Sequence, residues 1–125
     1  MRAQLGRAVG FEPAAVEHVM TALDQITQWP ERSVLRAWLL GCAAHYLGKE
    51  LTDERPTDAV ARFHLGNGAR VEHIHWAADL SPKGMRQSHG LMVNYLYDLR
   101  KLDRHREMMA QGKIPVSGDV EALYF

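Results

Sequence analysis

Hydrophobic and polar positions follow two different periods along the chain, and the period first changes near residue 58. Before that point apolar residues recur every three or four positions, the spacing of an amphipathic helix. Two such stretches, 13–29 and 34–48, are separated at Pro30 and predict a helical hairpin with a short connection. The polar residues 49–57 follow as a connector.

From residue 60 the apolar positions alternate, which predicts strands. The runs 60–65 and 70–76 flank Asn67-Gly68, and Asn-Gly between two alternating runs is a strong signal for a β-hairpin. In the register that this turn sets, His64 stands on the polar face of the hairpin. The opposite face is predicted to join the core and carries Phe63, Leu65, Ile74 and Trp76.

The last third of the chain returns to a helical period. Ser81-Pro82 pairs an N-cap residue with proline at the first helical position, and we expect this helix to continue to about Gly112. Ser117 is expected to cap a short final helix. The predicted fold class is therefore α+β (α/β in the broad sense). Residues 1–57 form a helical hairpin and connector, and residues 58–125 form a β-hairpin and a long C-terminal helix.

Composition narrows the class of protein further. The chain has 125 residues, the size of one domain or part of one, and its 15 basic residues balance its 15 acidic residues. Zero net charge argues against a nucleic-acid partner, and no apolar stretch is long enough to span a membrane. The single cysteine, Cys42, lies in an apolar run and is expected to be a buried thiol. A reducing, cytoplasmic location follows from the lack of a possible internal disulfide.

Seven histidines give the chain its main candidate chemistry. The neighbours of His64 would anchor a strand in the core and hold its imidazole rigidly at a cleft, although an ordinary strand histidine has the same pattern. His73 and His75 would share one strand face and, with His64 across the hairpin, could chelate a metal. No carboxylate or cysteine is expected beside them, so we predict no metal site.

Two further candidates come from the predicted C-terminal helix. Ser88 and His89 are adjacent and would diverge on a helix, so they are not expected to form a nucleophilic pair. Tyr95 and Tyr97 would also diverge, so at most one would face the hairpin. That phenol could orient a ligand or move a proton, whereas the alternative is ordinary packing of amphipathic tyrosines.

Three segments, 58–69, 76–84 and 87–99, resemble the malonyl-CoA decarboxylase family. The specific motifs are Phe-His-Leu-x-Asn-Gly-Ala and Gly-Leu-Met-x-Asn-Tyr. The resemblance implies the C-terminal part of that family's catalytic domain, with a GNAT-like acetyltransferase fold. It also implies conversion of malonyl-CoA to acetyl-CoA and CO2 without a cofactor, since the CoA thioester is the substrate. It assigns catalytic roles to His64 and Tyr97 and substrate contacts to Asn67 and Asn94.

Other parts of the family's site have no counterpart in these 125 residues. The family's catalytic serine, its Gly-rich CoA loop and an active-site glutamate all precede the helical hairpin, and His89 stands where a small residue is expected. We therefore expect a fragment that is inactive by itself, and that forms a homo-oligomer or is complemented by an upstream half. The alternative is a non-catalytic partner that binds another decarboxylase chain.

Overall fold

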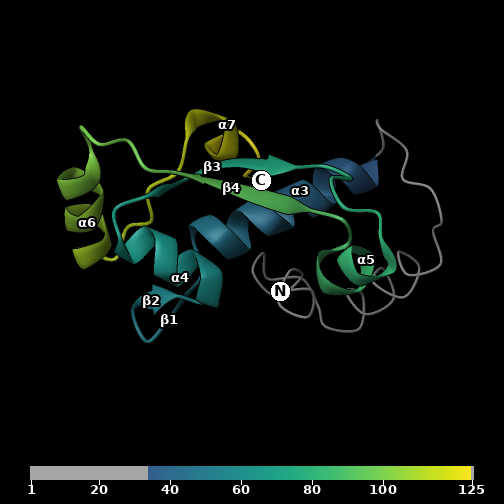
Figure 1. The fold of residues 1–125 in the computed structure, drawn as a ribbon, viewed down its shortest axis with the longest axis horizontal. Helices are drawn as coiled ribbons and strands as arrows, with labels where there is room; N and C mark the ends of the chain where they lie inside the picture. The colour runs from purple at the N-terminus through teal and green to yellow at the C-terminus, as the bar shows by residue number, and fades with distance from the viewer. Residues whose placement is uncertain (1–33, 125) are drawn as a thin grey trace.

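A computed structural model describes residues 34–124 of the chain (Figure 1). Helices and two small antiparallel sheets are mixed along the sequence, which confirms the α+β class. The elements in chain order are α3 (Val34–Gly48), β1 (Leu51–Thr52), β2 (Arg55–Pro56), α4 (Ala59–Gly66), β3 (Arg70–His75), α5 (Pro82–Ser88), β4 (Met92–Leu96), α6 (Leu102–Ala110) and α7 (Gly118–Glu121). The first helix of the predicted helical hairpin lies outside the described residues.

The larger sheet pairs β3 with β4, and α5 connects the two strands. Val71 lies opposite Tyr95 and Ile74 opposite Val93, with a register irregularity between Val71 and His73. At the other edge of β3, the amide of Val71 donates to the carbonyl of Pro115 at 3.0 Å, so the segment before α7 also lies along this strand. In Figure 1, α5 lies at one end of the pair of strands and α6 at the other.

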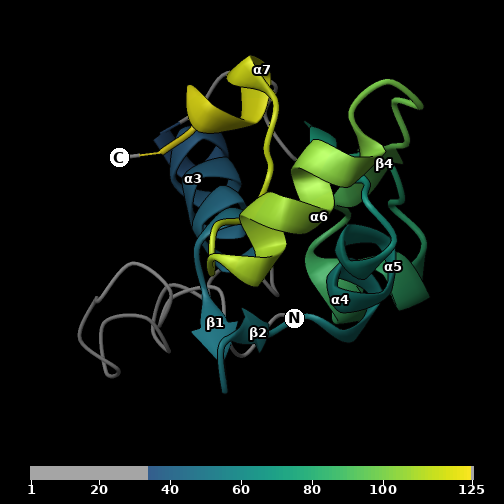
Figure 2. The ribbon, with the colours of Figure 1, turned by 90° about the vertical axis from the view of Figure 1, so that its left-hand side faces the viewer.

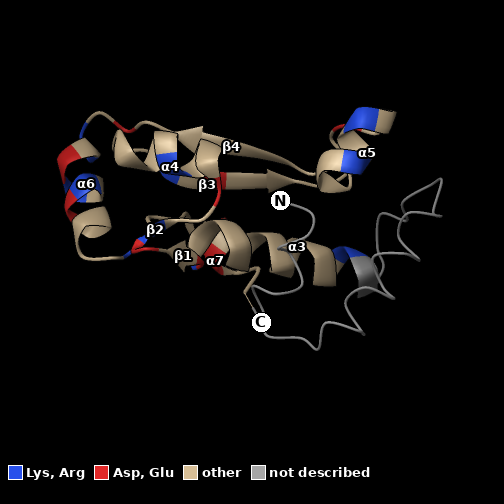
Figure 3. Cartoon of the chain, turned by 90° about the horizontal axis from the view of Figure 1, so that it is seen from below, with Lys and Arg blue, Asp and Glu red and all other residues tan. Residues whose placement is uncertain are grey.

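The core lies between α3 and one face of the sheet. Its buried members are almost all apolar and include Leu39, Cys42, Leu47, Val71 and Ile74. Figure 3 shows β3 and β4 lying alongside α3, which is largely free of charged residues, whereas α6 carries both signs of charge. Cys42 is fully buried, as predicted, and burial raises the pKa of its thiol to about 12.

The predicted strand over residues 60–65 is wrong, because this segment is helix α4. The side chain of Asp58 caps the helix by accepting a hydrogen bond from the amide of Ala61 at 3.0 Å. Ala61 and Leu65, four positions apart, form the buried face, whereas Phe63 is 65 % exposed instead of joining the core. The Asn-Gly signal marks the end of this helix, since Gly68 has φ +92°.

The predicted long helix from Ser81 is also wrong beyond its first two turns. Ser81 does cap α5, and its hydroxyl accepts from the amide of Gly84 at 3.1 Å. The helix ends at Ser88, because His89 (φ 53°) and Gly90 (φ 80°) both adopt the left-handed conformation. Strand β4 and a separate helix α6 follow. The cap of α7 by Ser117 is confirmed, and no described helix has the length and apolar character of a membrane span.

Candidate functional site

His64 lies in the last turn of α4, and three aromatic rings surround it. Its Nδ1 is 2.6 Å from the hydroxyl oxygen of Tyr97, a short hydrogen bond. Its ring stacks on Tyr95 with 4.6 Å between ring centroids and 21° between planes. Phe63 meets it edge-on at 5.1 Å. The imidazole is therefore fixed in both position and plane.

Both tyrosines reach His64 because the chain is extended here, with Tyr95 in β4 and Tyr97 directly after its last residue. Side chains two positions apart on a strand share a face, so Tyr95 and Tyr97 point the same way. The expectation that only one of them would face the histidine assumed a helix and is wrong. Tyr95 is a candidate from the sequence alone, but without a role beside His64, although the spacing of Tyr95 and Tyr97 is a usable signal. Any assignment of a strand to this segment would have paired them.

The two tyrosines differ in their surroundings. Tyr95 packs against the hydrophobic core, and burial, together with the nearby carboxylate of Asp58, raises the pKa of its phenol. It therefore stays neutral at any physiological pH and acts as a rigid apolar surface. Tyr97 is 39 % exposed, which leaves its hydroxyl open to solvent or a ligand as well as to His64.

The hydrogen bond at Nδ1 decides which nitrogen of His64 can meet a ligand. Within residues 34–124, Nε2 has no hydrogen-bond partner. If Nδ1–H donates to Tyr97, Nε2 carries a lone pair and can accept a proton. If the Tyr97 hydroxyl donates to Nδ1, Nε2–H can donate to a carboxylate or an enolate oxygen. The two forms interconvert when Nδ1 gains a proton from Tyr97 as Nε2 loses one to a ligand or solvent, or the reverse.

The start of α4 is tied to α3 through Asp58. The Tyr46 hydroxyl donates to one carboxylate oxygen of Asp58 at 3.1 Å, while the other oxygen caps the helix. Burial first, and then the charge of Asp58, raise the pKa of Tyr46, so its hydroxyl remains a donor. The helix that carries His64 is thereby fixed to the core at its first turn.

Asn67 and Asn94, the predicted substrate contacts, lie in different surroundings. The side-chain amide of Asn67 donates to the carbonyl of Phe63 at 2.8 Å and so satisfies the end of α4. Asn94 is exposed and lies opposite His73 on the sheet face that points away from Tyr95 and the core. The structure brings Asn67 near His64 along the chain but does not bring Asn94 to it. Their roles in substrate binding stay predictions.

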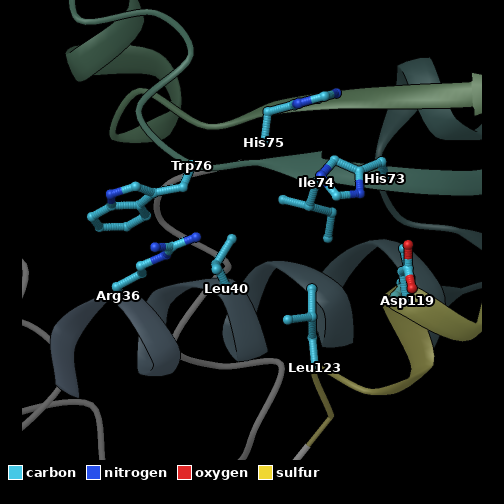
Figure 4. Close-up of a pocket in the computed structure, with 9 residues that line it drawn as sticks. Arg36, Leu40, His73, Ile74, His75, Trp76, Asp119 and Leu123 are labelled. Atoms are coloured by element: carbon cyan, nitrogen blue, oxygen red, sulfur yellow. The ribbon is translucent and has the colours of Figure 1, made fainter. Parts of the chain in front are cut away.

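His73 and His75 are also separated from His64. The ring centroids of His73 and His75 are 4.4 Å apart. His64, however, is on α4 and does not lie across a hairpin from them. Within the part of the chain that the structure describes, no three metal-ligating side chains come together. His73 and His75 instead line a cavity of about 440 Å³ with Arg36, Trp76 and Asp119 (Figure 4). None of the aromatic neighbours of His64 lines this cavity.

Ser88 and His89 do not form a reactive pair either. The Ser88 hydroxyl donates to the carbonyl of Leu91 at 2.8 Å, where the chain turns into β4. His89 is 1 % exposed and is the left-handed residue that ends α5. Ser88 therefore supports the turn between α5 and β4 through its hydroxyl, and His89 through its left-handed backbone.

The fold and the histidine–tyrosine cluster together are typical of an α+β enzyme domain. The chain belongs to the malonyl-CoA decarboxylase family, since residues 7–124 match the family described as "Malonyl-CoA decarboxylase C-terminal domain". Solved structures of two bacterial members agree with this family assignment. The malonyl-CoA decarboxylase of Cupriavidus metallidurans matches 95 % of the chain at 38 % identity with a TM-score of 0.79. That of Agrobacterium vitis matches 98 % at 41 % identity with a TM-score of 0.78.

Curated relatives match over a shorter stretch. Rat mitochondrial malonyl-CoA decarboxylase is 45 % identical over 67 residues, which are 54 % of this chain and 14 % of the rat protein. The goose enzyme is 43 % identical over 65 residues, 52 % of this chain and 13 % of that protein. The chain likewise covers 33 % and 32 % of the two bacterial structures. The chain therefore spans about a third of the two bacterial proteins and a smaller part of the two curated relatives.

Proposed function

We propose that this chain supplies the histidine–tyrosine part of a malonyl-CoA decarboxylase site, in which malonyl-CoA becomes acetyl-CoA and CO2. The observation that supports this most directly is the 2.6 Å contact between Nδ1 of His64 and the hydroxyl of Tyr97. It joins the two residues to which the resemblance assigns catalytic roles, although they are distant in sequence.

The reaction that we propose needs no cofactor. In a malonyl thioester the carboxylate is β to the thioester carbonyl, so the electron pair of the breaking C–C bond moves into an enolate as CO2 leaves. A proton delivered to C2 of the enolate then gives the acetyl thioester. The protein must orient the carboxylate, stabilise the enolate oxygen and deliver that proton. His64 can do this through Nε2, with Tyr97 holding or exchanging the proton at Nδ1.

The finer parts of the assignment are proposals as well. We place the chain in a GNAT-like acetyltransferase fold, in which α3, β3 and β4 belong to a larger sheet and its covering helices. Asn67 is the better candidate for a substrate contact, because its side-chain oxygen remains available while its amide caps α4. The unpaired Cys42 supports a reducing, cytoplasmic location.

Substitution of His64 tests the proposed chemistry. In a decarboxylase that contains this segment, His64→Gln should lower kcat by at least about a hundredfold, because general acid–base catalysis typically contributes that much. Acetyl-CoA formed from malonyl-CoA is the measured product. A matched control is His73→Gln, on the other sheet face, which should leave kcat unchanged. Near-normal turnover of the His64 variant would refute the catalytic assignment.

We also propose that the chain needs further residues for turnover. Its relatives are about three times as long, and no Gly-rich phosphate loop occurs in its sequence. An assay of the isolated 125-residue chain with malonyl-CoA should therefore show no acetyl-CoA above background. Addition of the upstream half of a related decarboxylase should restore turnover. Clear activity of the monomeric chain would contradict this proposal.

A non-catalytic partner is the second candidate function, and one observation favours it. Large apolar side chains are exposed in the segments that carry His64 and Tyr97, namely Val60 (59 %), Phe63 (65 %) and Leu99 (82 %). A surface of this kind is typical of contact with another polypeptide. Size-exclusion chromatography with an intact decarboxylase discriminates the two candidates. Stable association together with unchanged decarboxylase activity would favour the partner role.

A further inference from the structure

His105 on α6 stands outside every motif discussed so far, yet it is tied to the segment that carries His64. From its contacts we infer that His105 is a positioning residue for His64, acting through the backbone of residues 67–69. This inference rests on the proposed function of His64. It deepens that function by naming a residue that controls where the imidazole lies.

The first link is a buried hydrogen bond between distant parts of the chain. His105 is 5 % exposed, the only buried residue of α6, and its Nδ1 lies 3.0 Å from the carbonyl oxygen of Gly68. A carbonyl oxygen can only accept, so Nδ1 of His105 carries the proton and donates it. A buried carbonyl left without this donor would be costly, which makes the bond a firm constraint on Gly68.

The second link runs from residues 67–69, the connector between α4 and β3, back to His64. The carbonyl oxygen of His64 accepts from the amide of Asn67 at 3.1 Å and from the amide of Ala69 at 3.2 Å. The peptide group between Gly68 and Ala69 thus faces His105 with its oxygen and His64 with its N–H. A displacement of this one peptide group must be transmitted to the last turn of α4.

The third link is steric and polar contact between the connector and α6. A Cβ at Gly68 would lie 3.0 Å from the backbone oxygen of Leu102, so the connector is pressed against the first turn of α6. The guanidinium of Arg106 reaches the carbonyl oxygen of Asn67 at 3.4 Å. Helices α4 and α6 contact each other at this point (Figure 2). Together the three links hold both ends of the connector.

The consequence concerns the 2.6 Å contact between His64 and Tyr97. Tyr97 follows β4 and is fixed by the sheet, whereas His64 is fixed at the C-terminal end of α4 by His105. A shift of a few tenths of an ångström at Gly68 lengthens the hydrogen bond between them. Rates fall steeply with such misplacement, since about 1 Å can cost a hundredfold.

Paired substitutions at His105 separate this role from simple packing. His105→Asn keeps a donor close to the position of Nδ1, His105→Gln moves the donor outward, and His105→Leu removes it. Met109→Ala is the matched control, because Met109 packs against the core from the same helix, four residues beyond His105. Thermal denaturation compares the stability of the four variants.

The first readout is the tautomer of His64 in the 125-residue chain. Proton–nitrogen NMR correlations of the His64 ring measure it. We expect the wild-type signals in His105→Asn and Met109→Ala, and altered His64 signals in His105→Gln and His105→Leu. Unchanged His64 signals in His105→Gln would overturn the inference, and they would do so even if His105→Leu failed to fold. Altered signals in Met109→Ala at equal stability would overturn it too.

The second readout is turnover of malonyl-CoA in the assembly in which the wild-type chain is active. His105→Gln should lower kcat about tenfold with little change in KM, because a misplaced imidazole affects the reacting step more than binding. His105→Asn should restore kcat. If His64 signals change while kcat does not, His105 still positions the ring, and it is the proposed catalytic role of His64 that fails.

Discussion

Nδ1 of His64 and the hydroxyl of Tyr97 lie 2.6 Å apart, although 33 residues of sequence separate them. One comes from the last turn of a helix and the other from the end of a strand, and Tyr95 supports the ring between them. Each of these three side chains can be altered separately. The contributions of the hydrogen bond and of the stack are therefore separable by experiment.

Tyr97→Phe removes the hydrogen bond to His64 and keeps the ring. A hydrogen bond of this kind contributes about 1 kcal/mol, so we expect kcat for malonyl-CoA to fall about fivefold or more. The His64 ring should also lose its tautomer preference in NMR correlations. An unchanged tautomer in this variant would mean that the contact with Tyr97 does not control His64.

Tyr95 contributes a surface for stacking and no proton. Tyr95→Phe keeps the ring and should leave kcat near the wild-type value. Tyr95→Leu removes the stack, worth about 0.5–1.5 kcal/mol for an aromatic pair, and should lower kcat up to about tenfold. The comparison of these two variants at equal thermal stability is the measurement. Equal kcat values in both would show that the stack is irrelevant to turnover.

Gly68 and Gly66 provide a matched pair for stability. Gly68→Ala places a Cβ 3.0 Å from the Leu102 backbone at φ +92°, and we expect a loss of about 1–3 kcal/mol. Gly66→Ala lies in α4 with nothing within 4 Å and should be neutral or stabilising by up to about 1 kcal/mol. Urea unfolding followed by circular dichroism measures both. A similar loss in the two variants would contradict the tight contact with α6.

Cys42 provides a pH-dependent test of the core. Burial raises the pKa of its thiol from the ordinary 9.0 to about 12, so between these values the folded state binds more protons than the unfolded state. The free energy of unfolding must then fall as pH rises from 9 toward 12. Cys42→Ala should flatten this dependence in urea titrations. In the wild type, a thiol reagent at pH 8 should react only after denaturant is added.

The sequence predicted the residues of the site better than the elements that carry them. His64 stands in the Phe-His-Leu motif and Tyr97 in the matching segment 87–99, and the structure brings them into contact. The alternation of Phe63 and Leu65 with polar neighbours predicts a strand around His64. The cap at Asp58 and the four-residue spacing of Ala61 and Leu65 were the competing signals, and burial of these two residues decided in favour of a helix.

Strand β4 was missed for a different physical reason. Met92 and Leu96 are four positions apart, and such residues share a face in a helix and in a strand alike. Their spacing could therefore not distinguish the two structures. The pairing of β4 with β3 depends on a contact across the α5 connection, which local pattern does not contain. His89 and Gly90 were the local sign that the helix must end.

The pairing of β3 with β4 also sets the order in which this site can form. The backbone hydrogen bonds of helix α4 are local, but Tyr95 and Tyr97 reach His64 only after the chain has turned back through α5 and β4 has paired with β3. Contacts of long sequence separation form slowly, because the intervening chain must lose its freedom first. The histidine–tyrosine contact should therefore appear late in refolding, after helical structure, and mark the molecules that have completed their folding.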